Sequence, residues 1–176
     1  MRRVSVVGVP GSGKSTLGRE LAARLGVRYT ELDSIFHQPG WAPLDGEQFR
    51  RQVTAIAAGD GWVIDGNYSA VRPLVWERAD TVVWLDLPRR TVMRRIIWRT
   101  VRRAAGRTEL WNGNRERWRN LFTWDEQESV ISWAWHRYPV YRERYAAAAH
   151  DPACAHLTFL RVATRADVRQ LLDSAR

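Results

Sequence analysis

Gly8-Val9-Pro10-Gly11-Ser12-Gly13-Lys14-Ser15, followed by Thr16, is the stretch that decides how this chain can fold. It fits the phosphate-binding pattern G-x-x-x-x-G-K-[ST] at every fixed position. The apolar, β-branched residues 4–7 before it predict a strand, and the spacing of apolar residues over 15–25 predicts a helix. A glycine loop between a strand and a helix N-terminus directs backbone N–H groups and the positive helix end at an anion. A glycine-rich turn that matched by chance would lack this context, so we expect a loop that binds a nucleoside triphosphate.

The loop also supplies candidate side chains. Lys14 is expected to reach the β- and γ-phosphates, and the Ser15 hydroxyl to ligate Mg²⁺. Lys14 is the only lysine among 28 Lys and Arg residues, and a compact charge on a flexible stem suits this position better than a planar guanidinium. We expect the nucleotide to be bound by Gly8, Pro10, Gly11, Ser12, Gly13, Lys14, Ser15 and Thr16.

Length and composition favour one globular domain over residues 1–176, since 45% of the residues are hydrophobic and no low-complexity run divides the chain. Cys154 is the single cysteine, so it can form no disulfide within the chain. No apolar run approaches the length of a membrane span. We therefore expect a cytoplasmic protein without a membrane partner.

The positive charge is concentrated in one segment. The chain has a net charge of +9, and residues 89–119 alone contain 11 arginines against Glu109 and Glu116. The rest of the chain is balanced, so a strong positive field is expected in this segment. It predicts a polyanionic partner, for which a nucleoside triphosphate, a nucleic acid and a membrane surface all remain open.

Five predicted strands alternate with helices, which favours a three-layer α/β fold with a parallel sheet covered on both faces. The strands are expected at 4–7, 27–32, 62–64, 81–85 and 156–160. Residues 34–44 are expected to be loop, as part of an acceptor-binding insertion at about 34–60. Asp45 and Thr164 are expected to cap helices, and Thr123 with Glu126 predicts a capping box for a long helix that Pro139 could kink.

Aspartates follow three of the predicted strands. Because parallel strands place ligands at their carboxyl ends, Asp33, Asp65 and Asp86 could all face the nucleotide. We assign Asp65 to the metal and Asp33 to the acceptor as a proton-accepting base, with Asp86 as a third candidate. Each could instead cap the turn that follows its strand.

Arginines near the glycine break at Gly106 could close over the transferring phosphoryl group as a lid at about 103–119. The candidates are Arg99, Arg103, Arg107, Arg115 and Arg117, whereas the arginines of 89–95 are expected to form a solvated helix face. We expect the catalytic residues to be Lys14, Asp33, Arg103, Arg107 and Arg115. The residues expected to bind the acceptor are Asp33, Trp41, Asn67 and Arg72.

These motifs resemble the adenylate kinase and shikimate kinase branch of small phosphate-loop kinases. The series Glu-Leu-Asp at 31–33, Pro-Gly-Trp at 39–41, Asp-Gly-Asn-Tyr at 65–68 and Asn-Gly-Asn at 112–114 is most similar to adenylate-kinase-like proteins labelled DNA topology modulation proteins. The resemblance implies a P-loop NTPase fold with strand order 2-3-1-4-5, an arginine-rich lid, and ATP and Mg²⁺ as cofactors. The chain departs from nucleoside monophosphate kinases at Asn67-Tyr68, where they have Phe-Pro-Arg.

Two functions follow. The first is an ATP- and Mg²⁺-dependent phosphotransferase that acts on a nucleoside, nucleotide or other small-molecule acceptor. The alternative is a nucleotide-dependent regulator that binds DNA or RNA through the basic segment. A GTPase is excluded, because the guanine-reading motif needs a second lysine.

Overall fold

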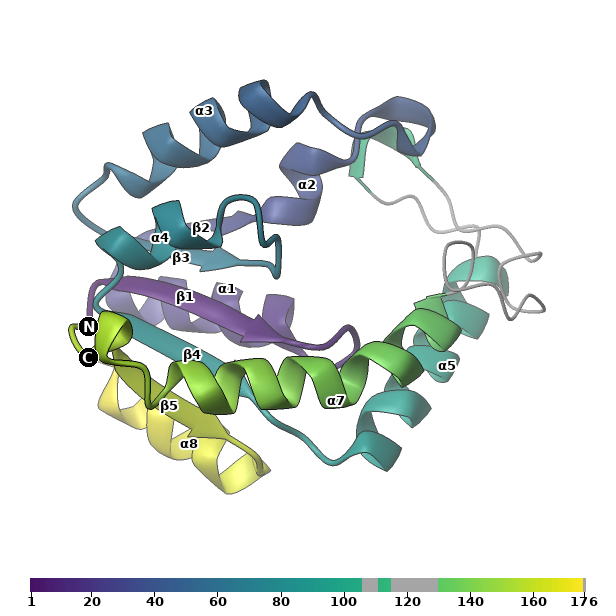
Figure 1. The fold of residues 1–176 in the computed structure, drawn as a ribbon. Helices are drawn as coiled ribbons and strands as arrows, with labels where there is room; N and C mark the ends of the chain where they lie inside the picture. The colour runs from purple at the N-terminus through teal and green to yellow at the C-terminus, as the bar shows by residue number, and fades with distance from the viewer. Residues whose placement is uncertain (106–110, 115–129, 176) are drawn as a thin grey trace.

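A computed structural model describes residues 1–105, 111–114 and 130–175 (Figure 1). Its centre is a five-stranded, all-parallel sheet in the order β2-β3-β1-β4-β5. The strands are β1 (Arg3–Gly8), β2 (Arg28–Glu31), β3 (Trp62–Asp65), β4 (Thr81–Leu85) and β5 (Thr158–Val162). The predicted fold class and strand order are therefore confirmed.

The helices are α1 (Lys14–Leu25), α2 (Leu32–Phe36), α3 (Gly46–Ala57), α4 (Arg72–Arg78), α5 (Arg89–Ala105), α7 (Val130–Ala148) and α8 (Arg165–Ser174). Short 3₁₀ turns are η1 (Pro39–Trp41), η2 (Trp111–Gly113) and η3 (Pro152–Cys154). Asp45 caps α3 by accepting from the N–H groups of Glu47 and Gln48, and Thr164 and Asp167 form a capping box at α8, as predicted. The predicted capping box of Thr123 and Glu126 lies outside the described residues.

Alternate residues of the buried strands divide the core into two layers, one on each face of the sheet. Val4 and Val6 of β1 pack with Leu21 of α1 and Leu171 of α8. On the opposite face, a larger cluster joins the sheet to α3, α4, α5 and α7, with Phe49, Val75, Trp76, Ile96 and Tyr145 among its members. Figure 1 shows α4 and α7 in front of the sheet and α1 behind it.

The expectation of a loop over residues 34–44 is wrong at its start. Strand β2 ends at Glu31, and the chain enters α2 at Leu32, so Asp33 lies in the first turn of a helix. Leu32, Ile35 and Phe36 have the i, i+3, i+4 spacing of an apolar helix face and pack into the core. The nearby prolines and glycines obscured this short pattern. The fifth strand also begins later than predicted, at Thr158.

Among the described helices, none is both long and apolar enough to cross a membrane.

Candidate functional site

The phosphate-binding loop leads from β1 directly into α1. Gly13 is the N-cap of α1, with φ 99°, and offers no side chain to cap the first turn. Gly11 has φ +74°, and a Cβ built on it would lie 2.4 Å from Ile96 Cγ1 of α5. Only glycine tolerates both this backbone conformation and this approach. Helix α5 therefore packs closely against one side of the loop, while the N-terminus of α1 remains available to an anion.

Two cationic side chains lie on the loop. Lys14 Nζ donates to the carbonyl of Val9 at 3.4 Å, and Arg95 Nη1 donates to the carbonyl of Ser12 at 3.2 Å. The expectation that the arginines of 89–95 only form a solvated face is thus wrong for Arg95. The periodicity of α5 gave no sign of this contact, because it depends on how the helix packs against the loop.

Two carboxylates converge on the hydroxyl of Ser15. Its Oγ lies 2.8 Å from Glu31 Oε1 and 2.9 Å from Asp65 Oδ2. Glu31 and Asp65 are the last residues of β2 and β3 and are aligned in the parallel register, which places both at the same edge of the sheet. The structure therefore brings together the predicted pair Ser15 and Asp65, and adds Glu31. Sequence reasoning missed Glu31 because it placed this residue inside a longer strand.

Burial raises the pKa of Asp65, whose residue is 2% exposed, and the nearby carboxylates of Glu31 and Asp33 act in the same direction. Lys14 and the Ser15 hydroxyl act in the opposite direction, because they favour the charged carboxylate. A cation between these carboxylates would relieve the repulsion. Within residues 1–105, 111–114 and 130–175, no group of three or more His, Cys, Asp and Glu side chains could hold a metal by itself. A set of two carboxylates and one hydroxyl fits Mg²⁺, which retains water and shares substrate phosphates.

Asp33 faces the same edge from α2 and is held by Tyr68. The Tyr68 hydroxyl donates to Asp33 Oδ1 at 2.7 Å and lies 3.5 Å from His37 Nε2. Burial, and then the charge of Asp33, raise the pKa of Tyr68, so the phenol stays a hydrogen-bond donor. Rings of Phe36 and Phe49 pack against Tyr68 at 4.7 and 5.1 Å between centroids and fix its position.

Arg72 begins α4 on the same side of the sheet as Tyr68. Its Nη1 is buried without a hydrogen-bond partner among the described residues, and its guanidinium lies 5.5 Å from the centroid of Trp76. Both Tyr68 and Arg72 line a cavity of about 10 Å³. A buried, unsatisfied guanidinium N–H is energetically unfavourable and is therefore available to an acidic or polar ligand.

Asn67, expected to bind the acceptor, forms hydrogen bonds with Gly8 and Tyr145. Its Nδ2 donates to the Gly8 carbonyl at 2.6 Å, and its Oδ1 accepts from the Gly8 N–H at 3.2 Å and from the Tyr145 hydroxyl at 2.9 Å. The amide thus ties the start of the phosphate loop to α7. Trp41, in contrast, is 39% exposed.

The expected lid is only partly within the described residues. The side chain of Arg103 and all of Arg107, Arg115 and Arg117 lie outside them. Residues 111–114, expected to belong to the lid, are held against the expected acceptor insertion. Asn114 is buried, and its Nδ2 donates to the Gln38 carbonyl while its Oδ1 accepts from the Trp41 N–H, both at 2.9 Å. Asn112 Nδ2 donates to the His37 carbonyl.

Asp86, the third carboxylate candidate, is engaged elsewhere. Its Oδ2 lies 2.6 Å from Arg161 Nη2 and 3.4 Å from Arg142 Nε. These ion pairs join β4 to β5 and α7, so Asp86 is explained as a structural anchor.

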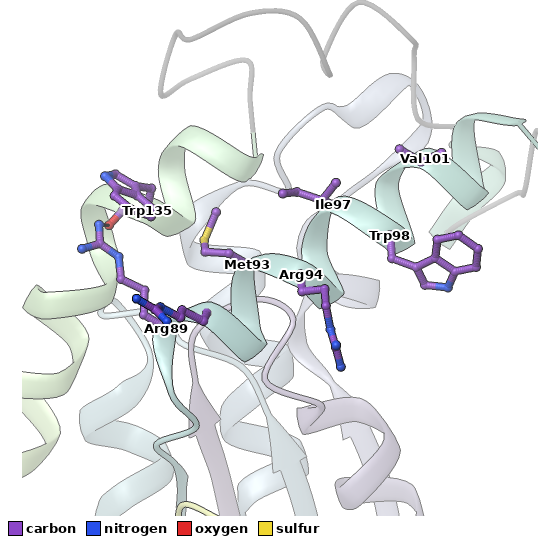
Figure 2. Close-up of a pocket in the computed structure, with 8 residues that line it drawn as sticks. Arg89, Met93, Arg94, Ile97, Trp98, Val101 and Trp135 are labelled. Carbon is purple, nitrogen blue, oxygen red and sulfur yellow. Dashed lines mark hydrogen bonds between the residues drawn. The ribbon is translucent and has the colours of Figure 1, made fainter.

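A separate apolar groove of about 710 Å³ runs between α5 and α7 (Figure 2). Its lining consists of Arg89, Arg90, Met93, Arg94, Ile97, Trp98, Val101 and Trp135. Arg89 lies over the Trp135 ring at 3.4 Å and donates to its carbonyl at 2.7 Å. None of the strand-end carboxylates lines this groove, so it is distinct from the site at the sheet edge.

Comparison with known proteins agrees with this architecture. The chain is 34% identical over 111 residues to a shikimate kinase of Mycobacterium avium (strain 104), an alignment that covers 55% of this chain and 63% of the relative. It therefore spans less than two thirds of that protein. A shikimate kinase structure from Bacteroides thetaiotaomicron superposes with a TM-score of 0.55 at 15% identity, covering 98% of this chain and 95% of that chain. A gluconokinase from Sinorhizobium meliloti 1021 superposes with a TM-score of 0.54 at 19% identity, covering 99% and 91%. These two likenesses show the fold.

The family comparison covers the site itself. The family model described as AAA domain matches residues 4–119, which include the phosphate loop and the aspartates Asp33, Asp65 and Asp86. That is more than half of the chain. The protein therefore belongs to this AAA domain family.

Proposed function

We propose that the protein is an ATP- and Mg²⁺-dependent phosphotransferase that acts on a small-molecule acceptor. The observation that carries this proposal is the convergence of Glu31 and Asp65 on the Ser15 hydroxyl, beside a phosphate loop and across from Asp33. The kinase names of its relatives support the same reaction class.

In this proposal the loop backbone and Lys14 hold the β- and γ-phosphates. Ser15, Asp65 and Glu31 would hold Mg²⁺, the last two through its water shell. The ion supplies charge neutralisation on the phosphate oxygens when it is bound. Arg95, which already lies on the loop, is placed to add a positive charge near the nucleotide.

Asp33 would accept the proton of the acceptor hydroxyl. The hydroxyl oxygen then bonds to the γ-phosphorus, and the bond from this phosphorus to the oxygen that bridges it to the β-phosphate breaks, which releases ADP. Tyr68 orients this carboxylate through the 2.7 Å hydrogen bond. Arg72 offers its unpaired buried Nη1 to an anionic or polar part of the acceptor, and Trp41 would cover the acceptor. In this proposal the transferring phosphoryl group is stabilised by the lid residues Arg103, Arg107 and Arg115.

The test is transfer of phosphate from labelled ATP to a panel of hydroxy acids, sugars, sugar acids, nucleosides and nucleoside monophosphates. We expect turnover of one class, at least a hundred-fold loss in Lys14→Ala, and a Mg²⁺-dependent loss in Glu31→Gln. Tight ATP binding without turnover of any acceptor would contradict a kinase.

A second candidate is nucleotide-dependent binding of DNA or RNA, which one observation favours. Helix α5 carries seven arginines and no acidic residue, and its Trp98 is 67% exposed. Arginines beside an exposed aromatic ring are typical of single-strand binding surfaces. The resemblance to proteins labelled DNA topology modulation proteins is a further reason for the test. Binding should weaken steeply with salt and fall in Arg94→Ala and Trp98→Ala; no binding at low salt would eliminate this candidate.

A further inference from the structure

A tyrosine that neither proposed function uses reaches the metal side of the site. The Tyr29 hydroxyl donates to Asp65 Oδ2 at 3.0 Å, the same oxygen that lies 2.9 Å from Ser15 Oγ. Tyr29 belongs to β2 and is only partly exposed. Its contact with Asp65 therefore joins the edge strand of the sheet to the last residue of the neighbouring strand.

The ring of Tyr29 fits against α1 only because position 18 is a glycine. A Cβ on Gly18 would lie 2.7 Å from Tyr29 Cε2 and 3.3 Å from Cδ2. Gly18 is buried in the interior of the helix, where glycine is less favourable than alanine. Helix propensity disfavours glycine at position 18, and the space that Gly18 leaves for the Tyr29 ring is a physical reason for its presence.

Arg19 contacts both Tyr29 and Glu31. Its guanidinium carbon lies 5.3 Å from the centroid of the Tyr29 ring, and its Nη2 pairs with Glu31 Oε2 at 3.1 Å. Gly18 and Arg19 thus both lie close to the Tyr29 ring, and its hydroxyl is the only polar group of the side chain.

The number of hydrogens explains what Tyr29 contributes. Ser15 has one hydroxyl hydrogen and two carboxylates within hydrogen-bond distance, so it can satisfy one of them at a time. The Tyr29 hydroxyl donates a hydrogen to Asp65 Oδ2, so the single hydrogen of Ser15 can be donated to Glu31. Neither hydroxyl contacts Asp65 Oδ1, the other oxygen of this carboxylate. We propose that Tyr29 is a positioning residue that holds Asp65 for metal-nucleotide binding, and that Gly18 admits its ring. This inference rests on the proposed kinase function.

The test is calorimetric titration of ATP into the full-length protein, with Mg²⁺ and with EDTA, for the wild type and Tyr29→Phe. We expect Tyr29→Phe to lose roughly ten-fold in affinity with Mg²⁺ and to match the wild type in EDTA, because a hydrogen bond to a charged group is lost on the metal side alone. Tyr138→Phe is the matched control, since it removes a tyrosine hydrogen bond to the Leu87 carbonyl, which is not part of the Glu31 and Asp65 cluster, and should leave both affinities unchanged.

Gly18→Ala tests the packing. Its new methyl group should displace the ring and reproduce the Mg²⁺-specific loss, whereas adding it to Tyr29→Phe should cause much less further loss. An unchanged Mg²⁺ effect in Tyr29→Phe, or an equal loss with and without Mg²⁺, would overturn the inference. A wild-type protein that binds no ATP in either condition would overturn the proposed function and this inference with it.

Discussion

Asn67 and Gly8 are joined by two hydrogen bonds of opposite direction, with Nδ2 donating to the Gly8 carbonyl at 2.6 Å and Oδ1 accepting from its N–H at 3.2 Å. The pairing of β1 with β3 ends at Val6, and the Asn67 side chain provides hydrogen bonds to Gly8, where β1 leads into the phosphate loop. The loop geometry depends on a residue that lies 59 positions away in the sequence.

Asn67→Ala should lower the free energy of unfolding by about 2 kcal/mol, because it leaves a backbone donor and acceptor of Gly8 unsatisfied. ATP affinity should fall as well, since the loop loses its anchor. Chemical denaturation and nucleotide titration would measure the two effects. Tyr145→Phe removes only one hydrogen bond to the same amide and should give a smaller change in both. A variant with wild-type stability would refute the anchoring role.

Tyr68→Phe should lower the rate of phosphoryl transfer roughly ten-fold while ATP affinity stays near that of the wild type. The reason is that the hydroxyl contacts Asp33 on the acceptor side and not the loop. Steady-state kinetics on whichever acceptor proves active would separate the two effects. A loss confined to ATP binding would show that Tyr68 has been assigned to the wrong half of the site.

Asn114→Ala should release η2 from the segment that contains Gln38 and Trp41, because one buried amide makes both contacts. Proteolysis should then cut faster at η2 (Trp111–Gly113), and the affinity for the acceptor should drop. Asn112→Ala removes a more exposed contact to the His37 carbonyl and should have a weaker effect. Equal protease sensitivity in wild type and Asn114→Ala would contradict this connection.

Asp86→Asn should destabilise the protein by about 1 kcal/mol, since Arg161 and Arg142 lose their counter-charge but remain about half exposed to solvent. It should leave the Mg²⁺ dependence of nucleotide binding unchanged. Thermal denaturation and titration with and without Mg²⁺ would check both statements. A selective loss of the Mg²⁺ effect would return Asp86 to the metal side.

Asp80 should contribute to the decrease in the free energy of unfolding at acidic pH. Burial opposes its charged form, but N–H groups of Arg3 and Arg2 and the Thr81 hydroxyl outweigh this effect and lower the pKa of Asp80 below 3.8. A lowered pKa in the folded state stabilises the fold above the unfolded-state pKa, and this contribution is lost as the pH falls through the folded-state pKa. Asp80→Asn should therefore be less stable than the wild type at neutral pH and approach it at strongly acidic pH, as measured by urea denaturation.

The sequence alone determined the fold class and the nucleotide side of the site. The loop from Gly8 to Ser15 has a fixed spacing whose chemistry is local, and the flanking strand and helix follow from apolar periodicity. The assignment of Asp65 to the same edge also followed from its place after a buried strand. These features depend on residues that are near one another in the chain.

Tertiary structure decided the residues that act between elements. Glu31 meets Ser15 through the register of β2 and β3, Tyr29 reaches Asp65 past Gly18, and Asn114 joins the segment that contains Trp41. Each contact joins positions between 16 and 73 residues apart, so no local pattern could predict it. Local patterns predicted Ser15, Asp33 and Asp65 at the edge of the sheet. Packing added Glu31 and Tyr29 and decided which groups share a hydrogen bond, because such a bond requires atoms about 3 Å apart.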